Sequence, residues 1–506
     1  MKSLHKYQWY ALAFVGLILL YFFTRLYHLS TFLPIFTDEA IYLHWSQIAL
    51  NDASWRFISL TDGKQPMYIW ISLIFLKLIH DPLAAGRMVS VAAGFFSMIG
   101  MFFLGREMFK NTKIGLLASL LYVLYPFALV YDKLAMYDSF VAMFMIWIFY
   151  FTVLLVRNVR LDLGMILGIV IGFGMLTKSD ADFGFILLPF SLILFPFKKN
   201  FDKERLFRWI AFALIAVIIA NAMYQILRLS PFFYIIGQKN LEFIYSFHDW
   251  IRQPFAFLFG NLKGLLGWFV GYMTVPLLVI TLFTFFVDKK FLREKILLLC
   301  WFIFPLLALA FFGKVIYPRF IFFMTMPIIV LGAYSLFMLL HIIKKNSLKI
   351  LVGVVFISMF IVNDFLILTD FPKALIPEGD QDQLYYGWSS GIGVSQTVAY
   401  LQEQAKQGKI YVSTEGTFGL MPYALDIYLD KNPNITIQSF WPVENIPPQD
   451  LIAASKKEPT YVVFYQACPT CNSKGIAPDS WPVTKIFSIK KLAPNTYYTL
   501  YKINPQ

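Results

Sequence analysis

The chain has 506 residues, of which 58% are hydrophobic and only 14% are charged. About one quarter of the residues in a soluble protein are charged, so the composition excludes an ordinary soluble protein. The net charge of +13 comes from Lys and Arg in short loops between apolar segments, which excludes a basic groove for nucleic acid. The chain is therefore predicted to be a polytopic α-helical membrane protein.

The apolar runs predict about eleven spanning helices, because each approaches the ~20 residues that cross a bilayer. The first run follows Lys2 and Lys6 and has no cleavage site after it, so we expect a retained anchor. The expected spans are residues 9–29, 88–104, 114–131, 139–156, 163–177, 183–197, 209–228, 265–287, 296–312, 320–341 and 349–368.

The charges of the loops predict the topology. Alternate loops are all basic, such as GREMFKNTK (105–113) and DKKFLREK (288–295). The positive-inside rule places these loops and the N-terminus in the cytoplasm, and an odd number of spans places everything after residue 369 outside. The short apolar piece 65–79 is expected to be an amphipathic helix in the outer interface. The expected location is the plasma membrane.

The composition changes at about residue 370. Segments such as KIYVST, ITIQSF and TYVVFY read as strands, with helical segments between them. This alternation predicts a small extracytoplasmic α/β domain over residues 370–506, after a transmembrane domain over residues 1–369. KIFSIKKL and TYYTLYKI are expected to add edge strands. The pair Cys468 and Cys471 is open to three interpretations, namely a half zinc site or redox motif, a local disulfide, or two idle thiols.

Polar residues that the positive-inside rule does not explain collect on the predicted outer face. Such a gathering is typical of a functional site at one membrane surface. The candidates are Asp38, Glu39, Lys64, Arg87, Asp132, Asp138, Lys178, Asp180, Lys314 and Arg319.

Several short motifs carry a family resemblance. FTDEAIY (36–42) is followed by KQPMYIW (64–70), by GRMVS with Arg87, by LAMYDSF (134–140), and by GKVIYPRFIFFMTMP (313–327). In this order they resemble the motifs of the GT-C glycosyltransferases, and more narrowly those of the protein O-mannosyltransferase and lipid A aminoarabinose transferase family. The resemblance covers roughly residues 9–345 and implies a GT-C-like catalytic domain.

The resemblance implies transfer of a sugar from a polyprenyl phosphate donor to an acceptor hydroxyl, with inversion at the anomeric carbon. Asp38 matches the catalytic aspartate and is expected to act as the general base, with Glu39 beside it. Lys64, Lys314 and Arg319 are expected to bind the leaving phosphate. Asp138 and Arg87 are further substrate-binding candidates, with Asp138 or Glu39 orienting the acceptor or holding sugar hydroxyls.

Plainer interpretations stand beside these expectations. Asp38 and Glu39 could cap a helix, Lys64 could extend toward the interface, and residues 178–182 fit a solvated loop. Carboxylates could hold a divalent cation, but the subgroup that the chain resembles needs none, so no metal or other cofactor is expected.

The acceptor is a protein, a lipid or a glycan, and neither it nor the sugar is named by the residues. The alternative function is a transporter or flippase of a lipid-linked or small polar solute. A third interpretation is a membrane-anchored binding protein that works through its outer domain.

Overall fold

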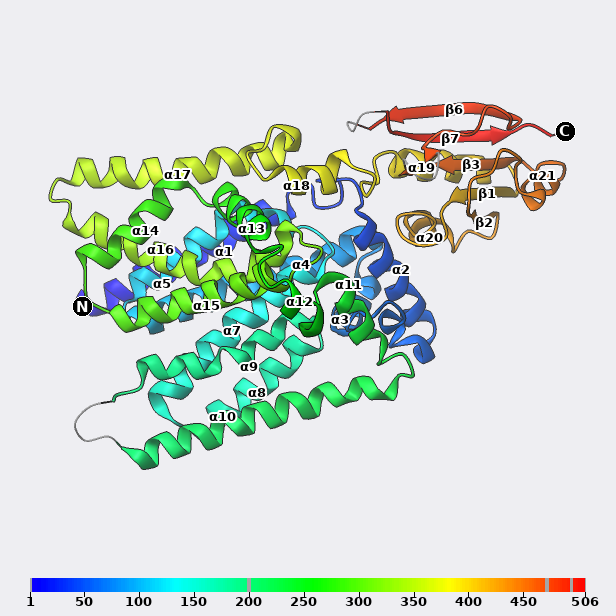
Figure 1. Cartoon of the computed structure of the whole chain (residues 1–506). Helices are drawn as coiled ribbons and strands as arrows, with labels where there is room; N and C mark the ends of the chain where they lie inside the picture. The colour runs from blue at the N-terminus through cyan, green and yellow to red at the C-terminus, as the bar shows by residue number, and fades with distance from the viewer. Residues whose placement is uncertain (1, 198–201, 469–472, 492–494, 506) are drawn as a thin grey trace. The chain divides into compact units, whose positions relative to one another are not determined.

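The computed structural model describes residues 2–197, 202–468, 473–491 and 495–505 (Figure 1). The chain forms two compact units. One, called here the membrane unit, comprises Met1–Tyr27, Arg56–Ile71 and Arg87–Pro377. The other, called the C-terminal unit, comprises His28–Trp55, Ser72–Gly86 and Glu378–Gln506. The C-terminal unit therefore takes in two segments from near the start of the chain.

Long apolar helices make up the membrane unit. Within the described ranges, seven helices are long and apolar enough to cross a membrane, or up to eight if a bent pair is one span. The seven are α1 (Lys2–Leu26), α4 (Pro82–Phe109), α7 (Tyr137–Asn158), α10 (Lys203–Tyr224), α15 (Leu292–Phe312), α16 (Phe322–Ile342) and α17 (Asn346–Thr369).

Shorter helices account for the remaining predicted spans. They are α5 (Thr112–Val123), α6 (Pro126–Tyr131), α8 (Leu161–Met175), α9 (Phe183–Ile186), η4 (Leu188–Leu194), α13 (Leu258–Tyr272) and α14 (Val275–Val287). The segment expected in the outer interface forms the helix α3 (Met67–Leu78). The polytopic helical fold is confirmed, while the count of about eleven spans stays a prediction.

Two predicted spans are divided into two α-helices at a proline. Residues 114–131 divide into α5 and α6, and Pro126 opens the second helix. Residues 265–287 divide into α13 and α14, which meet at a bend of 106° and have a proline in the first turn of α14. Proline lacks the N–H that would continue the helix and disfavours helical geometry in the residue before it. Both breaks therefore have a local cause in the sequence.

Glycines let α8 approach α10 closely. A Cβ added to Gly164 would lie 2.8 Å from the carbonyl oxygen of Phe212, and one added to Gly168 would lie 2.7 Å from that of Ala216. The two glycines are four residues apart and share one helix face. Small residues at this spacing allow backbones to pack tightly in a membrane, and the two helices run side by side (Figure 1).

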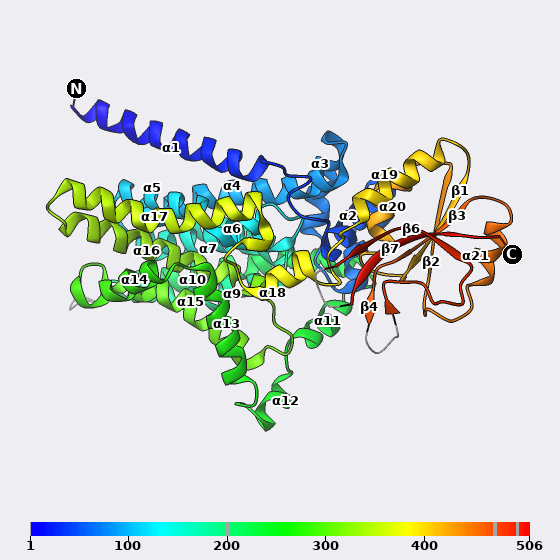
Figure 2. The same cartoon turned by 90° about the horizontal axis from the view of Figure 1, so that it is seen from above.

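A mixed sheet forms the centre of the C-terminal unit (Figure 2). Its strand order is β2-β1-β3-β7-β6. Strand β1 is parallel to β2 and β3, whereas β7 is antiparallel to β3 and β6. The strands are β1 (Ile410–Glu415), β2 (Ile435–Phe440), β3 (Thr460–Phe464), β6 (Val483–Lys490) and β7 (Tyr497–Ile503). The predicted α/β domain is confirmed.

One expectation about this sheet is wrong. KIFSIKKL forms the edge strand β6, but TYYTLYKI forms β7, which lies between β3 and β6. The burial of β7 explains its place, because five of its residues are buried and only Lys502 is exposed. Two further short strands, β4 (Ala467–Cys468) and β5 (Ser473–Lys474), pair with each other. The side chains of Cys468 and Cys471 lie outside the described part of the chain.

Four helices of at least seven residues lie wholly within the described part of the C-terminal unit. They are α2 (Thr37–Asn51), α19 (Val394–Ala405), α20 (Tyr423–Leu429) and α21 (Gln449–Ser455). Leu451 of α21 packs with Val462, Phe464 and Trp481 in a buried cluster. Strands β1 and β3 are buried along their whole length, as expected for parallel strands covered on both faces.

Candidate active site

The membrane unit brings together segments that are far apart in the sequence. The side-chain amide of Gln65 donates to Ser179 Oγ at 2.9 Å, and Tyr137 OH donates to the backbone oxygen of Gln65 at 3.0 Å. Asn240 Nδ2 reaches the same Ser179 Oγ at 3.3 Å. These contacts place the neighbours Lys64, Asp138 and Lys178 in one region.

Asp138 and Lys178 form the ion pair of this region. Lys178 Nζ lies 3.2 Å from Asp138 Oδ1 and 2.9 Å from Asp180 Oδ2. The Asp138 side chain is only 7% exposed, and that of Lys178 is 24% exposed. The interpretation of residues 178–182 as a solvated loop is therefore wrong for Lys178, because its ammonium is held by a nearly buried carboxylate.

Burial and neighbouring charges have opposite effects on the pKa of Lys178. Desolvation lowers the pKa of Lys178, but Asp138 and Asp180 outweigh it, so that the pKa is raised above its usual value. Arg319 opposes this increase, which shows that its charge is close. Desolvation, followed by the charge of Asp180, raises the pKa of Asp182 to about 6. Lys178 therefore remains a cation at neutral pH.

Three cations of this region lie close to two phenyl rings. Phe243 and Phe320 meet edge to face with their centroids 6.0 Å apart. Lys64 Nζ lies 5.2 Å from the centroid of Phe243. Lys178 Nζ lies 4.6 Å from that of Phe320, and the Arg319 guanidinium carbon lies 5.7 Å from it. We call these five residues the cation cluster.

Lys314 lies on the chain beside this cluster. Its backbone N–H donates to the carbonyl oxygen of Phe243 at 2.7 Å, and its side chain is exposed. The sequence-based candidates Lys64, Asp138, Lys314 and Arg319 are thus brought to one region of the membrane unit. The four cations Lys64, Lys178, Lys314 and Arg319 outnumber the two carboxylates Asp138 and Asp180. Such a group of cations can bind an anion such as a phosphate.

The carboxylates Asp38 and Glu39 belong to the C-terminal unit, in the first turn of α2. Glu39 is fully buried, and its Oε2 accepts a hydrogen bond of 2.9 Å from the backbone N–H of Phe36. This contact satisfies a donor at the helix start, so the capping interpretation is confirmed for Glu39. Asp38 is half-buried.

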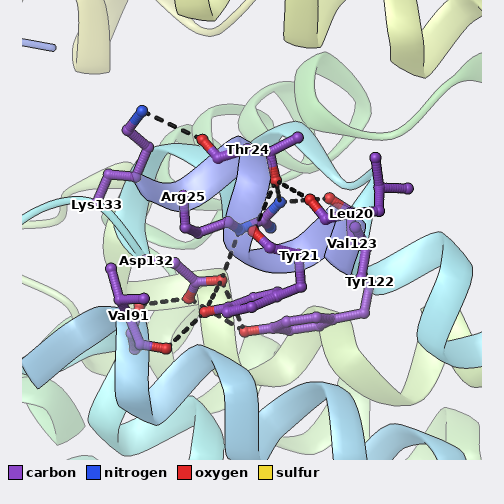
Figure 3. A network of polar contacts seen from close by, with 10 residues as sticks. Leu20, Tyr21, Thr24, Arg25, Val91, Tyr122, Val123, Asp132 and Lys133 are labelled. Atoms are coloured by element: carbon purple, nitrogen blue, oxygen red, sulfur yellow. Dashed lines mark hydrogen bonds and ion pairs between the residues drawn. The ribbon is translucent and has the colours of Figure 1, made fainter. Parts of the chain in front are cut away.

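A buried polar network occupies another part of the membrane unit (Figure 3). Arg25 Nε lies 3.4 Å from Asp132 Oδ2, and neither side chain is exposed. Tyr122 OH donates to the same carboxylate at 3.1 Å. Lys133 Nζ donates to two carbonyl oxygens at the end of α1. Asp132 is fully buried, and Arg25 compensates the charge of its carboxylate. The expectation that Asp132 lies toward the outer face stays a prediction.

Arg87 lies with this buried network. It is fully buried in α4. Desolvation, followed by the charges of Arg25 and Arg87, lowers the pKa of Lys133 to about 7. The three cations are therefore near one another. The prediction that Arg87 binds substrate stays a prediction.

Sequence reasoning placed Lys178 on the predicted outer face but favoured a solvated loop over a role in the site. The available signal was its place in TKSD, directly after a predicted span and on the same predicted face as Asp138. Across the residues that the structure describes, no group of three or more His, Cys, Asp or Glu side chains is placed to hold a metal ion. The expectation that the chain needs no metal stays a prediction.

Comparisons with known proteins agree with this architecture. Residues 63–224 match the family model of dolichyl-phosphate-mannose-protein mannosyltransferases. The fold is similar to that of ArnT from Cupriavidus metallidurans, solved with bound undecaprenyl phosphate, with a TM-score of 0.61 and 12% identity over 99% of both chains. The comparison with curated proteins gives no match.

Two more distant structures share the fold. One is the oligosaccharyltransferase AglB from Archaeoglobus fulgidus, in complex with an inhibitory peptide and a dolichol-phosphate. Its TM-score is 0.50 at 14% identity, over 90% of this chain and 69% of that one. The other is the mycobacterial arabinofuranosyltransferase AftD. Its TM-score is 0.51 at 12% identity, over 99% of this chain and 42% of that one. The predicted GT-C fold is confirmed.

Proposed function

We propose that this chain, which has the GT-C fold, is an integral membrane glycosyltransferase. In this proposal it moves a sugar from a polyprenyl-phosphate-linked donor to an acceptor hydroxyl at the extracytoplasmic face of the membrane. The observation that carries the proposal is the cation cluster, in which Lys64, Lys178 and Arg319 surround two touching phenyl rings. The expected location is the plasma membrane, with a cytoplasmic N-terminus.

The cations suit the leaving group of this reaction. A sugar phosphate breaks its C–O bond to give a phosphate anion, which needs positive donors rather than a general acid. Arg319 can offer two parallel N–H bonds, whereas Lys64 and Lys178 act as point charges. The neighbouring rings keep part of the surroundings apolar, which strengthens each charge interaction. Lys314, on the adjacent loop, is proposed as a further phosphate ligand.

Asp38 is proposed as the general base. As the acceptor oxygen attacks the anomeric carbon, its proton passes to the Asp38 carboxylate, and the bond to phosphate breaks on the opposite face. The anomeric configuration is therefore inverted. Because Glu39 is engaged by the backbone of its own helix, we propose that it positions Asp38. Asp138 is proposed to hold Lys178 in place or to bind a sugar hydroxyl.

The solved structures support the class of donor. ArnT has been solved with undecaprenyl phosphate and AglB with a dolichol-phosphate. We therefore propose a polyprenyl phosphate sugar as the donor for this chain. The acceptor is a protein, a lipid or a glycan, and no cofactor is proposed.

Binding of undecaprenyl phosphate to the purified protein tests the role of the cation cluster. We expect Arg319→Ala and Lys64→Ala each to raise the Kd by roughly 10- to 150-fold, since one charge-assisted contact contributes about 1.5–3 kcal/mol. Lys344→Ala removes an exposed lysine from a predicted cytoplasmic loop and should leave the Kd unchanged. Equal affinity in all four proteins would refute the assignment.

A second measurement separates transfer from transport. A flippase would also bind the carrier, but it would move a labelled lipid across a vesicle without changing it chemically. We expect no such movement from this chain. Movement across vesicles together with no sugar transfer from any donor would replace the glycosyltransferase proposal with the flippase one.

A further inference from the structure

The segment that precedes Asp38 is paired with the C-terminal part of the chain. The backbone N–H of Thr37 donates to the oxygen of Ser389 at 3.0 Å, and that of Gly391 donates to the oxygen of Ile35 at 2.8 Å. Phe36 and Ser390 form an antiparallel bridge between these bonds. The hydroxyl of Thr37 adds a third bond to Ser389 at 3.0 Å. We call residues 35–37 and 389–391 the bridge.

Residues 389–391 of the bridge are anchored to the sheet of the C-terminal unit, to which both sides of the bridge belong. Lys491 is fully buried, and its Nζ donates to the backbone oxygens of Trp388 and Ser390 at 3.1 Å each. Lys491 directly follows the edge strand β6. A buried ammonium is costly unless it is fully hydrogen-bonded, so these two contacts tie residues 388–390 to the sheet.

The body of α2 is held by α20, another helix of the C-terminal unit. Gln47 Nε2 donates to the oxygen of Ile427 in α20 at 2.9 Å. The ring of His44 stacks on that of Tyr423, with centroids 4.1 Å apart and planes 11° from parallel. Helix α2 is therefore fixed at its start by the bridge and along its length by α20.

We propose that the C-terminal domain, residues 370–506, is a positioning element of the transfer reaction, because the bridge fixes the backbone from which Asp38 projects. The inference rests on the proposed function, in which Asp38 is the base. It assigns positioning roles to residues more than three hundred positions away in the sequence. A base displaced by about 1 Å can cost on the order of a hundredfold in rate, so a small shift of the bridge should be measurable.

Gly391 offers a direct way to disturb the bridge. A Cβ added there would lie 2.6 Å from both the backbone oxygen and Cγ2 of Ile35. These distances are too short for a Cβ contact, so the two backbone segments must move apart at Ile35 and Gly391. Gly391→Ala therefore perturbs the chain three residues before Asp38 without touching Asp38 itself. Ser395→Ala, at an exposed position of α19 nearby, is the matched control.

Transfer kinetics test the positioning role. We expect Gly391→Ala to lower kcat at least tenfold with the KM for the lipid-linked donor changed less than twofold, and Ser395→Ala to change neither. Ile35→Ala should partly restore kcat in the Gly391→Ala background, because it removes one of the two close contacts. Thr37→Val, which keeps the side-chain shape but loses one hydrogen bond, should give a smaller loss of kcat. Wild-type kcat in folded Gly391→Ala would overturn the proposal.

Amide hydrogen exchange gives a readout that needs no activity. In the wild-type protein the amides of Thr37 and Gly391 should be protected, and both should exchange at least tenfold faster in Gly391→Ala. Fast exchange of both amides in the wild-type protein would overturn the bridge itself. If the wild-type protein transfers no sugar, the proposed function fails, and protected amides would still show that the C-terminal domain holds this segment.

Discussion

Replacing Lys178 with methionine removes the charge between Asp138 and the ring of Phe320. Lys178 Nζ lies 3.2 Å from Asp138 and 2.9 Å from Asp180. Methionine has a similar length and remains apolar, so its contact with Phe320 is largely kept. The proposed phosphate site loses one of its cations, while Asp138 loses the ammonium that it faces.

The size of the effect follows from the surroundings of Lys178. Removing one preorganised donor from a water-excluded site costs about 3–4 kcal/mol of transition-state stabilisation. Lys178 is 24% exposed, and two carboxylates already share its charge, so we take about half of that figure. A loss of about 2 kcal/mol corresponds to a rate roughly 30-fold lower.

Lys239→Met is the matched control for this change. Lys239 is 22% exposed and also pairs with two carboxylates, Asp62 and Glu242, each at 2.9 Å. The assay is the initial rate of sugar transfer in detergent, for proteins with equal melting temperatures. We expect Lys178→Met to lower the rate roughly 30-fold and Lys239→Met to lower it less than threefold. Equal rates for the two variants would refute a role for Lys178 in binding the phosphate.

Three further outcomes are expected. Glu39→Gln keeps an oxygen that can accept the hydrogen bond from the Phe36 backbone N–H, so this variant should retain most activity. Glu39→Ala loses the cap, which should lower the free energy of unfolding by about 1 kcal/mol and lower both the melting temperature and kcat. A larger loss of activity in Glu39→Gln than in Glu39→Ala would contradict the capping role. Arg319→Lys keeps the charge but loses the fork, so the Kd for undecaprenyl phosphate should rise less than in Arg319→Ala. Equal values would contradict two-pronged binding. Desolvation, opposed by Glu415, lowers the pKa of Lys491 to about 8. The unfolded state therefore binds more protons between about pH 8 and pH 10.5, and stability rises with pH there by about 3 kcal/mol relative to Lys491→Met. Parallel melting profiles would contradict that shift.

Much of the helical fold could be predicted from local sequence. Each predicted span contains a helix in the structure, because apolar length alone specifies a segment that must satisfy its own backbone in a membrane. The breaks before Pro126 and near Pro276 were missed, although both prolines are visible in the sequence. The signal was ambiguous, since Pro305 and Pro327 lie inside the unbroken helices α15 and α16. A proline in the sequence therefore does not by itself show whether the helix is interrupted there.

The site could be predicted only in part. Loop charges and motifs gathered Lys64, Asp138, Lys314 and Arg319, which the structure brings to one region. Lys178 was noted on the predicted outer face but assigned to a solvated loop, because the pairing of its ammonium with Asp138 is set by how α7 and the loop after α8 meet. Likewise, no local pattern shows that Thr37 pairs with Ser389. Long-range pairs such as these depend on tertiary packing and have no periodic signature.

The most direct test of the central claim is sugar transfer by the wild-type protein and by Asp38→Asn. Purified protein is given a panel of radiolabelled polyprenyl phosphate sugars together with a lysate of candidate acceptors, after both proteins are shown to fold alike. We predict transfer from at least one donor by the wild-type protein and its loss in Asp38→Asn. Transfer that persists in Asp38→Asn would contradict the assignment of Asp38 as the base, and no transfer from any donor would contradict the glycosyltransferase function itself.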